Sequence, residues 1–268
     1  MQQLSLTEIQ IATKEIVKFI DDLCNKLGLK YFALYGTVIG AIRHQGFIPW
    51  DDDFDIGMFR KDFEIFKEYM LTHDTGFFYL DNVEANKEYP FYISRVCDKR
   101  YQLVFEGFNY TSGLFVDIYP YDGLGNSEDI IWWKKRSKRL YNLRKGMLLS
   151  RWSTLFFGNS TFHRLFNIPY LLFCRMAGNS FFFKRLDRYS KFFDVDKSQY
   201  VDCPCWAGRI HFYEKKWFEE TIRVKFENIT ICIPKEYDSF LRSLYGDYMV
   251  LPPESKRIPT HGYKAYKI

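Results

Sequence analysis

The sequence lacks the features of a membrane-spanning, secreted or disulfide-stapled chain. No apolar run reaches the roughly 18 residues that would cross a bilayer. The opening residues MQQLSLTEIQIATKEIV have neither the basic n-region nor the apolar h-region of a secretory signal. Six cysteines in 268 residues do not make a disulfide framework. These absences predict a protein of the reducing cytoplasm.

The sequence also lacks the signatures of nucleic-acid-binding modules. It has no RNP-like strand, no zinc-finger spacing and no helix-turn-helix signal. Cys203 and Cys205 are separated by one proline, which is the wrong spacing for a zinc knuckle, and no second Cys/His pair matches them. Internal repeats and low-complexity linkers are absent as well. We therefore expect no nucleic-acid partner and read the two cysteines as ordinary thiols.

What is present is ordinary for a globular chain, with one exception. Apolar residues make up 47% and charged residues 26%, so a folded core is expected. The length allows one large domain or two small ones. Aromatic residues reach 20%, with 27 Phe and 20 Tyr, which is unusually high. The net charge of +5 is by itself a weak indication of anionic partners.

The positive charge is concentrated in one segment. Residues 130–193 carry 14 Lys or Arg and one acidic residue, Asp187, whereas the rest of the chain carries 24 basic and 32 acidic residues. The segment is also rich in aromatics. It fits a set of helices that pack aromatic faces on the core and keep basic faces in water. It equally fits contact with an anionic membrane surface or a lipid-linked anionic substrate, because cations and interfacial aromatics are attracted there.

Hydrophobic periodicity predicts alternating helices and strands. Apolar residues from Ile9 to Leu27 repeat at three and four positions, which indicates an amphipathic helix with a Ser5–Glu8 capping box and a stop at Gly28. The other predicted elements are strands at 31–36, 54–58, 91–98, 103–108 and 113–123, helices at 37–46, 62–71 and 236–245, and a strand pair within 223–234.

The stretch WDDDFDIGM crowds four carboxylates into five positions. Its second half alternates acidic and apolar residues, so Asp53 and Asp55 should share one face of a strand, two rises of roughly 3.3 Å apart, and repel each other. A divalent cation resolves that conflict, and oxygen ligands favour Mg²⁺ or Mn²⁺. Asp117, alone in an apolar strand, supplies a third ligand if the strands are neighbours. Such a site suits phosphoryl transfer. Asp51 and Asp52 fit a solvated turn.

The preceding stretch YGTVIGAIRHQG offers groups that a phosphate needs. Gly36 allows close approach of backbone, and Thr37 can cap the helix that follows, whose N-terminus presents free N–H groups. Arg43 adds a fork of donors suited to phosphate.

These two stretches together resemble a known signature. YGTVIGAIRHQGFIPWDDDFDIGMFRKDFEIF (35–66) is similar to the signature of LicD-type transferases, the bacterial phosphocholine transferases related to fukutin and fukutin-related protein. SRVCDKR (94–100), GLFVDIYPYDG (113–123) and YGDYMVLPPESKR (245–257) resemble later LicD segments in the same order. Residues 130–193 match only in being long, basic and aromatic.

The resemblance implies an α+β fold: a nucleotidyltransferase-like mixed sheet flanked by helices, with a basic-aromatic helical insertion. It divides the chain into a catalytic core (1–129), the insertion (130–193) and a part that completes core and active site (194–268). Gly36 and Thr37 match the glycine-hydroxyl position. Asp53 and Asp55 match the Asp-x-Asp position, and Asp117 the third catalytic carboxylate, all three as metal ligands.

The reaction that the resemblance implies moves phosphocholine from CDP-choline to a hydroxyl of a cell-surface glycan and releases CMP. The acceptor would be a lipid-linked teichoic acid or lipopolysaccharide precursor, which places the enzyme peripherally on the inner face of the plasma membrane. Asp117 would complete the metal site or take the hydroxyl proton. Tyr119, Tyr121 and Trp206 are candidates for a cation–π cage around choline.

Other residues remain candidates for substrate binding. Arg95 and Lys99 could reach phosphates, and His44 and His261 lie in stretches that resemble the family's. Three alternatives stay open: a donor carrying another CDP-alcohol, ribitol or glycerol phosphate; a nucleotide-sugar donor, because Asp-x-Asp also binds its metal-diphosphate; and a catalytically silent, membrane-associated scaffold.

Overall fold

The computed structural model describes residues 2–105, 110–151, 161–204, 206, 210–259 and 262–268. Its centre is a mixed sheet of nine strands. The hydrogen-bonded order is β1–β11–β5–β6–β3–β2, with β4 beside β5 and β7 bridging β6 to β8. Their bounds are β1 Gln2–Gln3, β2 Phe32–Ala33, β3 Asp55–Phe59, β4 Phe78–Asp81, β5 Ser94–Phe105, β6 Thr111–Gly125, β7 Tyr200–Asp202, β8 Tyr213–Glu214 and β11 Tyr263–Lys267. The β3–β6 pair is parallel and the others are antiparallel, so the predicted α+β class is confirmed.

Strand β5 corrects one prediction. Two strands were expected at 91–98 and 103–108, but one strand runs from Ser94 to Phe105. Its register against β6 shifts between Asp98 and Leu103, so the interruption in the sequence pattern is an irregularity inside one strand. Pairing of Tyr101 to Phe105 with β11 keeps the chain extended beyond it.

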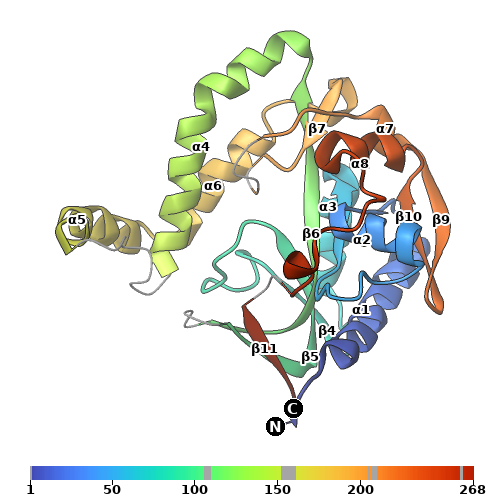
Figure 1. The fold of residues 1–268 in the computed structure, drawn as a ribbon. Helices are drawn as coiled ribbons and strands as arrows, with labels where there is room; N and C mark the ends of the chain where they lie inside the picture. The colour runs from blue at the N-terminus through green and yellow to red at the C-terminus, as the bar shows by residue number, and fades with distance from the viewer. Residues whose placement is uncertain (1, 106–109, 152–160, 205, 207–209, 260–261) are drawn as a thin grey trace.

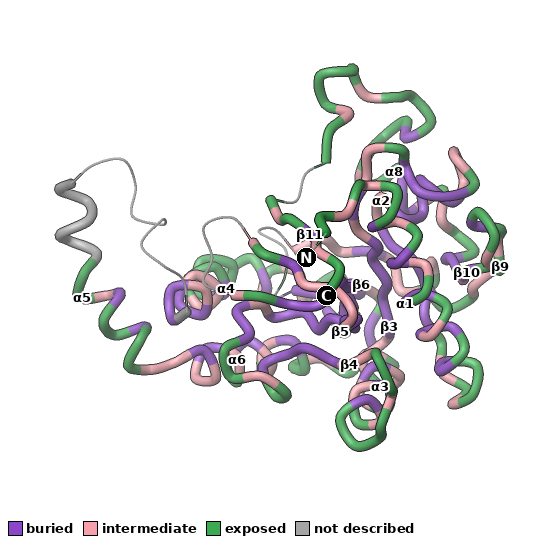
Figure 2. Tube along the Cα trace, turned by 90° about the horizontal axis from the view of Figure 1, so that it is seen from below, coloured by how far each residue is buried: buried purple, intermediate pink, exposed green. Residues whose placement is uncertain are grey.

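Helix α1 (Leu6–Leu27) forms as its sequence predicts. Ser5 accepts from the Glu8 N–H, and the Glu8 carboxylate accepts from the Ser5 N–H at 2.7 Å, which completes the capping box. Gly28 ends the helix in the left-handed region at φ 66°. The buried face, which includes Ile16 and Ile20, packs into the core that Figure 2 shows along the sheet strands.

Shorter elements surround the sheet in Figure 1. Helix α2 (Tyr35–Ile39) continues as the π-helical turn η1 (Gly40–His44), and α3 (Arg60–Thr72) follows β3. The C-terminal part adds α7 (Lys216–Glu219), the hairpin β9 (Thr221–Phe226) and β10 (Ile229–Pro234), and α8 (Tyr237–Tyr245). Single 3₁₀ turns occur at η2 (Ser127–Asp129), η4 (Val195–Lys197) and η5 (Glu254–Lys256).

Three helices form a helical arm that stands away from the sheet (Figure 1): α4 (Ile130–Arg151), α5 (Thr161–Ala177) and α6 (Asn179–Ser190). Gly146 lets α4 lie close to α6, because a Cβ at that position would be 2.3 Å from the Phe182 ring. None of the helices that the structure describes is both long enough and apolar enough to cross a membrane.

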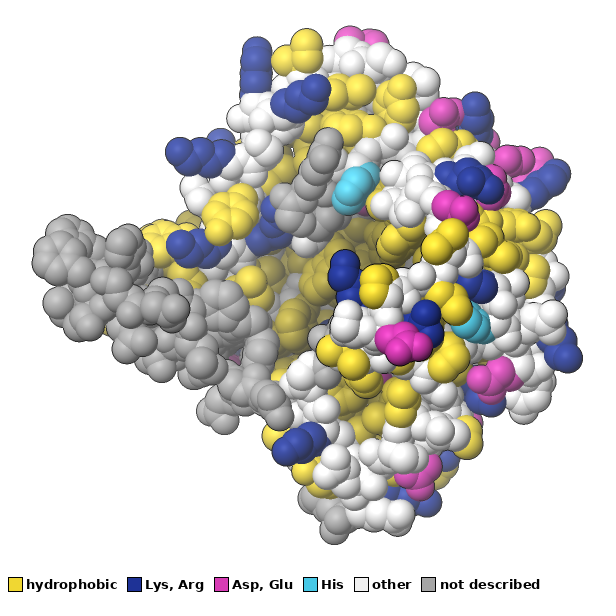
Figure 3. All heavy atoms as spheres, in the orientation of Figure 1, with side chains coloured by type: hydrophobic (Ala, Val, Ile, Leu, Met, Phe, Trp, Pro, Cys, Tyr) yellow, Lys and Arg dark blue, Asp and Glu magenta, His cyan; other side chains and the backbone are white. Residues whose placement is uncertain are grey.

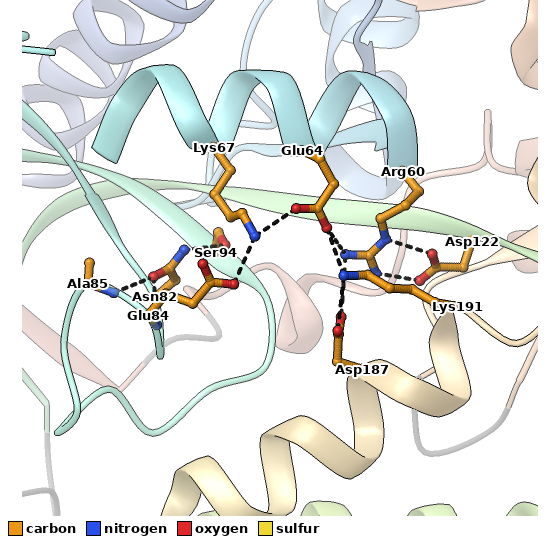
Figure 4. Close-up of polar contacts among 10 residues, drawn as sticks. All are labelled: Arg60, Glu64, Lys67, Asn82, Glu84, Ala85, Ser94, Asp122, Asp187 and Lys191. Atoms are coloured by element: carbon orange, nitrogen blue, oxygen red, sulfur yellow. Dashed lines mark hydrogen bonds and ion pairs between the residues drawn. The ribbon is translucent and has the colours of Figure 1, made fainter. Parts of the chain in front are cut away.

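An ion-pair network fastens the arm to the core (Figure 4). Arg60, at the start of α3, donates to both carboxylate oxygens of the buried Asp122 on β6, at 2.7 and 2.6 Å. It also lies 3.6 Å from Asp187 of α6. Lys191 joins Asp187 to Glu64, at 3.0 Å from each. Charges from α3, β6 and the end of the arm thus meet at one place.

Candidate active site

The two strand carboxylates lie opposite each other. Asp55 on β3 and Asp117 on β6 are register partners in the parallel pair, so the condition under which Asp117 could join Asp55 is met. Both side chains are buried. The Asp55 N–H donates to Thr37 Oγ1 at 3.0 Å, which fixes the first residue of β3 against α2.

Asp55 is a buried acid without a cationic partner among the residues that the structure describes. Its Oδ1 has no hydrogen-bond partner there. Burial, and then the charges of Asp53, Asp117 and Asp51, raise the pKa of Asp55 well above its ordinary value, against a hydrogen bond from Tyr119. A carboxylate in these surroundings is stabilised by a cation next to it.

Asp117 has such a cation. Arg95 of β5 donates from Nε to its Oδ1 at 2.7 Å. The Arg95 guanidinium lies 3.7 Å from the centre of the Phe115 ring and 4.3 Å from that of Phe91. Burial acts to lower the pKa of Arg95, but the pairing with Asp117 outweighs it and raises the pKa. Arg95, predicted to contact phosphate, is therefore engaged in positioning Asp117.

The acidic loop before β3 (Asp51 to Asp53) differs from the prediction. The strand begins at Asp55, so Asp53 lies in the loop instead of on the strand. Carboxylate oxygens of Asp51, Asp52 and Asp53 lie within 4.8 Å of one another. Asp52 is buried, so the expected solvated turn is wrong for it.

Backbone anchors hold this loop in place. Gln10 of α1 donates to the Asp51 carbonyl at 2.9 Å, and the Tyr263 hydroxyl of β11 donates to the Asp52 carbonyl at 2.6 Å. A Cβ on Gly36 would lie 2.9 Å from Asp51 Oδ2. The close neighbour of Gly36 in the structure is therefore a carboxylate of the loop, and the approach of a phosphate to this glycine stays a prediction.

Thr37 has a different role from the predicted helix cap. Helix α2 begins two residues earlier, after Leu34, and has no side-chain cap. Thr37 lies inside its first turn, and its hydroxyl accepts the Asp55 N–H. The residue therefore joins the glycine-hydroxyl stretch to the carboxylate strand.

Arg43 lies with a second arginine that the sequence analysis did not single out. Arg43 Nη1 donates to the Tyr248 carbonyl at 2.6 Å, and Nε donates to His44 Nε2 at 3.0 Å. Burial and the charge of Arg257 lower the pKa of Arg43, while burial and Arg43 lower that of His44. Arg257 lies 5.6 Å from the ring of Trp50, the residue before the acidic loop. Within the described parts of the chain, neither arginine pairs with a carboxylate, so the pair can receive an anion.

The remaining candidates are scattered. Lys99 is exposed on β5, four residues or about 13 Å from Arg95 along the strand, and does not join the carboxylates. His261 and Cys205 lie outside the described residues, and Cys203 is buried. Tyr121 is fully buried among core rings, so it cannot contact choline.

Of the three aromatic candidates for a cage, Trp206 alone is exposed, and Tyr119 is buried behind it. Their rings meet edge-on with centroids 5.8 Å apart, and Tyr35 packs on Tyr119 at 5.5 Å. Tyr119 also contacts Asp55. Trp206 is 37% exposed, so part of its side chain is accessible to a ligand.

Two tyrosines at the site escaped the sequence analysis. Tyr245, at the end of α8, has its pKa raised by burial of its hydroxyl and by Asp55, Asp51 and Asp53. Tyr263 of β11 anchors the acidic loop. Tyr245 and Arg257 are the first and last residues of YGDYMVLPPESKR, the stretch that resembles a LicD segment, so this resemblance could have identified both as site residues. No motif in the sequence pointed to Tyr263.

The donor set fits a divalent cation. Asp51, Asp52, Asp53 and Asp55 offer only oxygen, which favours Mg²⁺ or Mn²⁺ over zinc. The orphaned Oδ1 of Asp55 and the crowding of the loop carboxylates are the two observations that favour a cation here. Asp117 lies beside them, already paired.

Comparison with known proteins finds relatives among phosphoalcohol transferases. The family model described as LicD/FKTN/FKRP, nucleotidyltransferase domain, matches residues 28–156. The lipopolysaccharide cholinephosphotransferase LicD of Haemophilus influenzae is 29% identical over 272 residues, covering 99% of this chain and 99% of that protein. An uncharacterized protein of Rickettsia prowazekii is 46% identical over 48 residues, 18% of each chain.

A more distant relative comes from animals. The ribitol 5-phosphate transferase FKRP of Mus musculus is 33% identical over 51 residues, covering 19% of this chain and 10% of that protein. The family match spans the glycine-hydroxyl stretch, the acidic loop, Asp55 and Asp117. The chain thus contains a stretch similar to the LicD/FKTN/FKRP nucleotidyltransferase domain, and along its full length it is similar to a LicD cholinephosphotransferase, a transferase.

Proposed function

We propose that this enzyme transfers phosphocholine from CDP-choline to a hydroxyl of a lipid-linked cell-surface glycan, a lipopolysaccharide or teichoic acid precursor, and releases CMP in a reaction that requires Mg²⁺ or Mn²⁺. The observation that carries the proposal is the buried Asp55, whose Oδ1 has no partner in the described residues, beside a loop of three carboxylates. The full-length likeness to a cholinephosphotransferase favours phosphocholine as the group transferred.

In this proposal the carboxylates and the arginines of the site have separate roles. The acidic loop and Asp55 would hold the cation, which when bound neutralises charge on the donor diphosphate. Arg43 and Arg257 bind the phosphate oxygens that belong to the departing CMP. Asp117 is held in one orientation by Arg95, and such a fixed anion serves better as a ligand or an orienting group than as a mobile base.

The choline end of the donor needs an aromatic surface. Trp206, whose ring meets that of Tyr119, offers one, and a trimethylammonium group over its ring gains a cation–π attraction of about 0.5–2 kcal/mol. Trp206→Ala should then raise KM for CDP-choline, while leaving KM for a donor without a quaternary ammonium unchanged.

A second donor is favoured by one observation. The relative that matches 51 residues is named a ribitol 5-phosphate transferase. CDP-ribitol is therefore the alternative donor, and it would need hydroxyl-binding groups where choline needs aromatic rings.

The membrane part of the proposal rests on the helical arm. Helix α5 exposes Leu172 (54%), Phe173 (51%) and Met176 (88%), which repeat at helical spacing on its surface. Basic side chains lie along the arm on the face shown in Figure 3. An exposed apolar stripe next to cations favours peripheral contact with an anionic bilayer. Phe173→Ser/Met176→Ser should reduce sedimentation with phosphatidylglycerol vesicles, and unchanged sedimentation would contradict this placement.

The test of function is release of CMP from CDP-choline and from CDP-ribitol, with Mg²⁺ and extracted lipid-linked glycan. Wild type is compared with Asp55→Asn and Asp117→Asn, and with Asp74→Asn, an exposed acid far from the site along the sheet, as control. Release that depends on acceptor and collapses only in the first two variants supports the proposal. CMP release from CDP-ribitol but not from CDP-choline would make CDP-ribitol the donor. No CMP release from either donor would refute the proposed function.

A further inference from the structure

A cavity lined by arginines and aromatic rings lies in the helical arm, away from the carboxylates. It has a volume of about 470 Å³, within the usual range for small-ligand sites. Four arginines line it, Arg136 and Arg139 from α4 and Arg185 and Arg188 from α6. We name this cavity the arginine cleft.

The charge of the arginine cleft is not compensated by protein groups. Among the residues that the structure describes, no carboxylate pairs with any of the four arginines. Asp187, the one acidic residue of segment 130–193, instead forms ion pairs with Arg60 and Lys191 where the arm meets the core. Four guanidinium groups around one cavity repel each other, so an anion bound among them is favoured.

Aromatic rings hold the guanidinium groups in place. Arg136 lies 3.9 Å from the centre of the Trp132 ring and also donates to the Trp132 carbonyl at 3.2 Å. Arg139 lies 5.5 Å from the Tyr189 ring centre. Trp132 in turn stacks on Phe192 at 4.4 Å. Planar donors already ordered by stacking lose less entropy when they bind phosphate oxygens in pairs.

The arginine cleft is distinct from the carboxylate site. The start of α4 is tied to the far part of β6, where Trp133 Nε1 donates to the Leu124 carbonyl at 2.9 Å. Leu124 is seven residues beyond Asp117, about 23 Å along the strand. A ligand that used both sites would therefore be extended, with its phosphate well separated from its reacting hydroxyl.

We propose that the arginine cleft binds the phosphate or diphosphate group of the acceptor substrate, at a second site remote from the carboxylates. This inference rests on the proposed function, because it gives the lipid-linked glycan a phosphate-binding site that the donor does not use. The stacked aromatic rings suit the sugar attached to that phosphate.

The test uses inorganic pyrophosphate as probe, titrated calorimetrically into full-length protein with EDTA present. Arg139→Gln/Arg188→Gln removes two exposed cleft arginines. Lys135→Gln/Lys138→Gln is the matched control, since it removes the same charge from exposed positions of α4 outside the cleft. We expect pyrophosphate to bind wild type and control alike, and the arginine variant at least tenfold more weakly. Equal binding by all three proteins overturns the proposal.

Two further measurements distinguish an acceptor phosphate from a lipid headgroup as the ligand of the cleft. They also distinguish failure of the cleft proposal from failure of the proposed function. The arginine variant should raise KM for the phosphorylated acceptor and leave KM for the donor unchanged. Its binding to phosphatidylglycerol vesicles should equal that of the control; vesicle binding lost without any effect on pyrophosphate would mean a lipid-headgroup site and overturn the assignment. If no donor gives transfer but pyrophosphate binding still depends on the two arginines, the phosphate site stands and the proposed function fails.

Discussion

Asp55 and Asp117 occupy equivalent positions on adjacent parallel strands but have opposite surroundings. Asp117 has the buried guanidinium of Arg95 at 2.7 Å. Asp55 has other carboxylates nearby, and its Oδ1 has no partner among the described residues. Of the two adjacent acids, one is neutralised by the protein, and we propose that the other is neutralised by a cation. This difference distinguishes a binding site from a structural ion pair.

Replacing Arg95 should strongly lower the free energy of unfolding. Arg95→Met leaves Asp117 buried without its partner, and breaking a buried pair in this way costs about 3–5 kcal/mol. Arg95→Lys should recover part of that loss. The measurement is the free energy of unfolding in urea, with Arg242→Met, from an exposed pair, as control. An Arg95→Met protein as stable as wild type would show that Asp117 does not need this cation.

The Thr37 hydroxyl should be required for both stability and activity. Thr37→Val leaves the buried Asp55 N–H without its acceptor, at a cost of about 1–3 kcal/mol, whereas Thr37→Ser keeps the oxygen. We expect Thr37→Val to lower the free energy of unfolding and the transfer rate together, and Thr37→Ser to stay near wild type. If valine and serine behave alike, the hydroxyl is not what positions Asp55.

Asp202 should make the protein less stable as pH rises. Burial raises the pKa of Asp202 to about 7, although backbone N–H groups of His211 and Cys203 and the charge of Arg144 act to lower it. The unfolded chain loses this proton near pH 4, so between about pH 4 and 7 the folded state alone retains it. The contribution of Asp202 to the free energy of unfolding therefore falls as pH rises from about 4 to 7, by up to about 4 kcal/mol.

The check on Asp202 is a comparison of unfolding free energies at the two ends of the window. Asp202→Asn should gain stability relative to wild type as pH rises from the acid side to above 7, and the exposed Asp74→Asn should follow wild type throughout. A wild-type pH dependence in Asp202→Asn would contradict the assignment.

At the scale of elements, the arm is held to the core by charge where it meets α3 and β6. Arg60→Gln should leave the buried Asp122 carboxylate without its bidentate partner and should leave Asp187 of α6 paired with Lys191 alone. We expect a loss of about 3–5 kcal/mol in unfolding free energy. Faster proteolysis within the arm should accompany it. The exposed Arg242→Gln is again the control, and an arm equally resistant in both variants would refute this role.

Elements with local signals were predictable, and those set by distant partners were not. The Ser5–Glu8 box, the apolar spacing and Gly28 specify α1 completely within its own sequence. The continuity of β5 depends on β11, more than 150 residues further along the chain, which no local pattern contains. The start of β3 at Asp55, and with it the loop position of Asp53, depends on where β6 and Thr37 offer hydrogen-bond partners.

The same division holds for the candidate site. The alternation around Asp55 and the isolated acid at Asp117 predicted that both strands would carry carboxylates to one place, and the strands are register partners. The pairing of Arg95 with Asp117 was not predicted, because burial and pairing are tertiary features. Tyr263 was missed because an aromatic residue in a terminal strand looks like any other core residue in so aromatic a chain.

At the scale of the whole molecule, the acidic candidate site and the basic arginine cleft lie in different parts of the structure. The sheet carries the acidic site, and Tyr263 of β11 donates to the loop, while the helical arm, which stands away from the sheet in Figure 1, carries the arginine cleft. Such a layout suits an enzyme that binds a metal-nucleotide at one place and an extended anionic acceptor at another.

The most direct measurement is the melting temperature of wild type and Asp55→Asn, each with EDTA and with Mg²⁺. Without metal, Asp55→Asn should melt higher than wild type, because the raised pKa of Asp55 means that its charge destabilises the folded state at neutral pH. With Mg²⁺, wild type and the control Asp74→Asn should gain several degrees, and Asp55→Asn little or nothing. A lower melting temperature for Asp55→Asn without metal, together with an undiminished response to Mg²⁺, would contradict a cation site at Asp55.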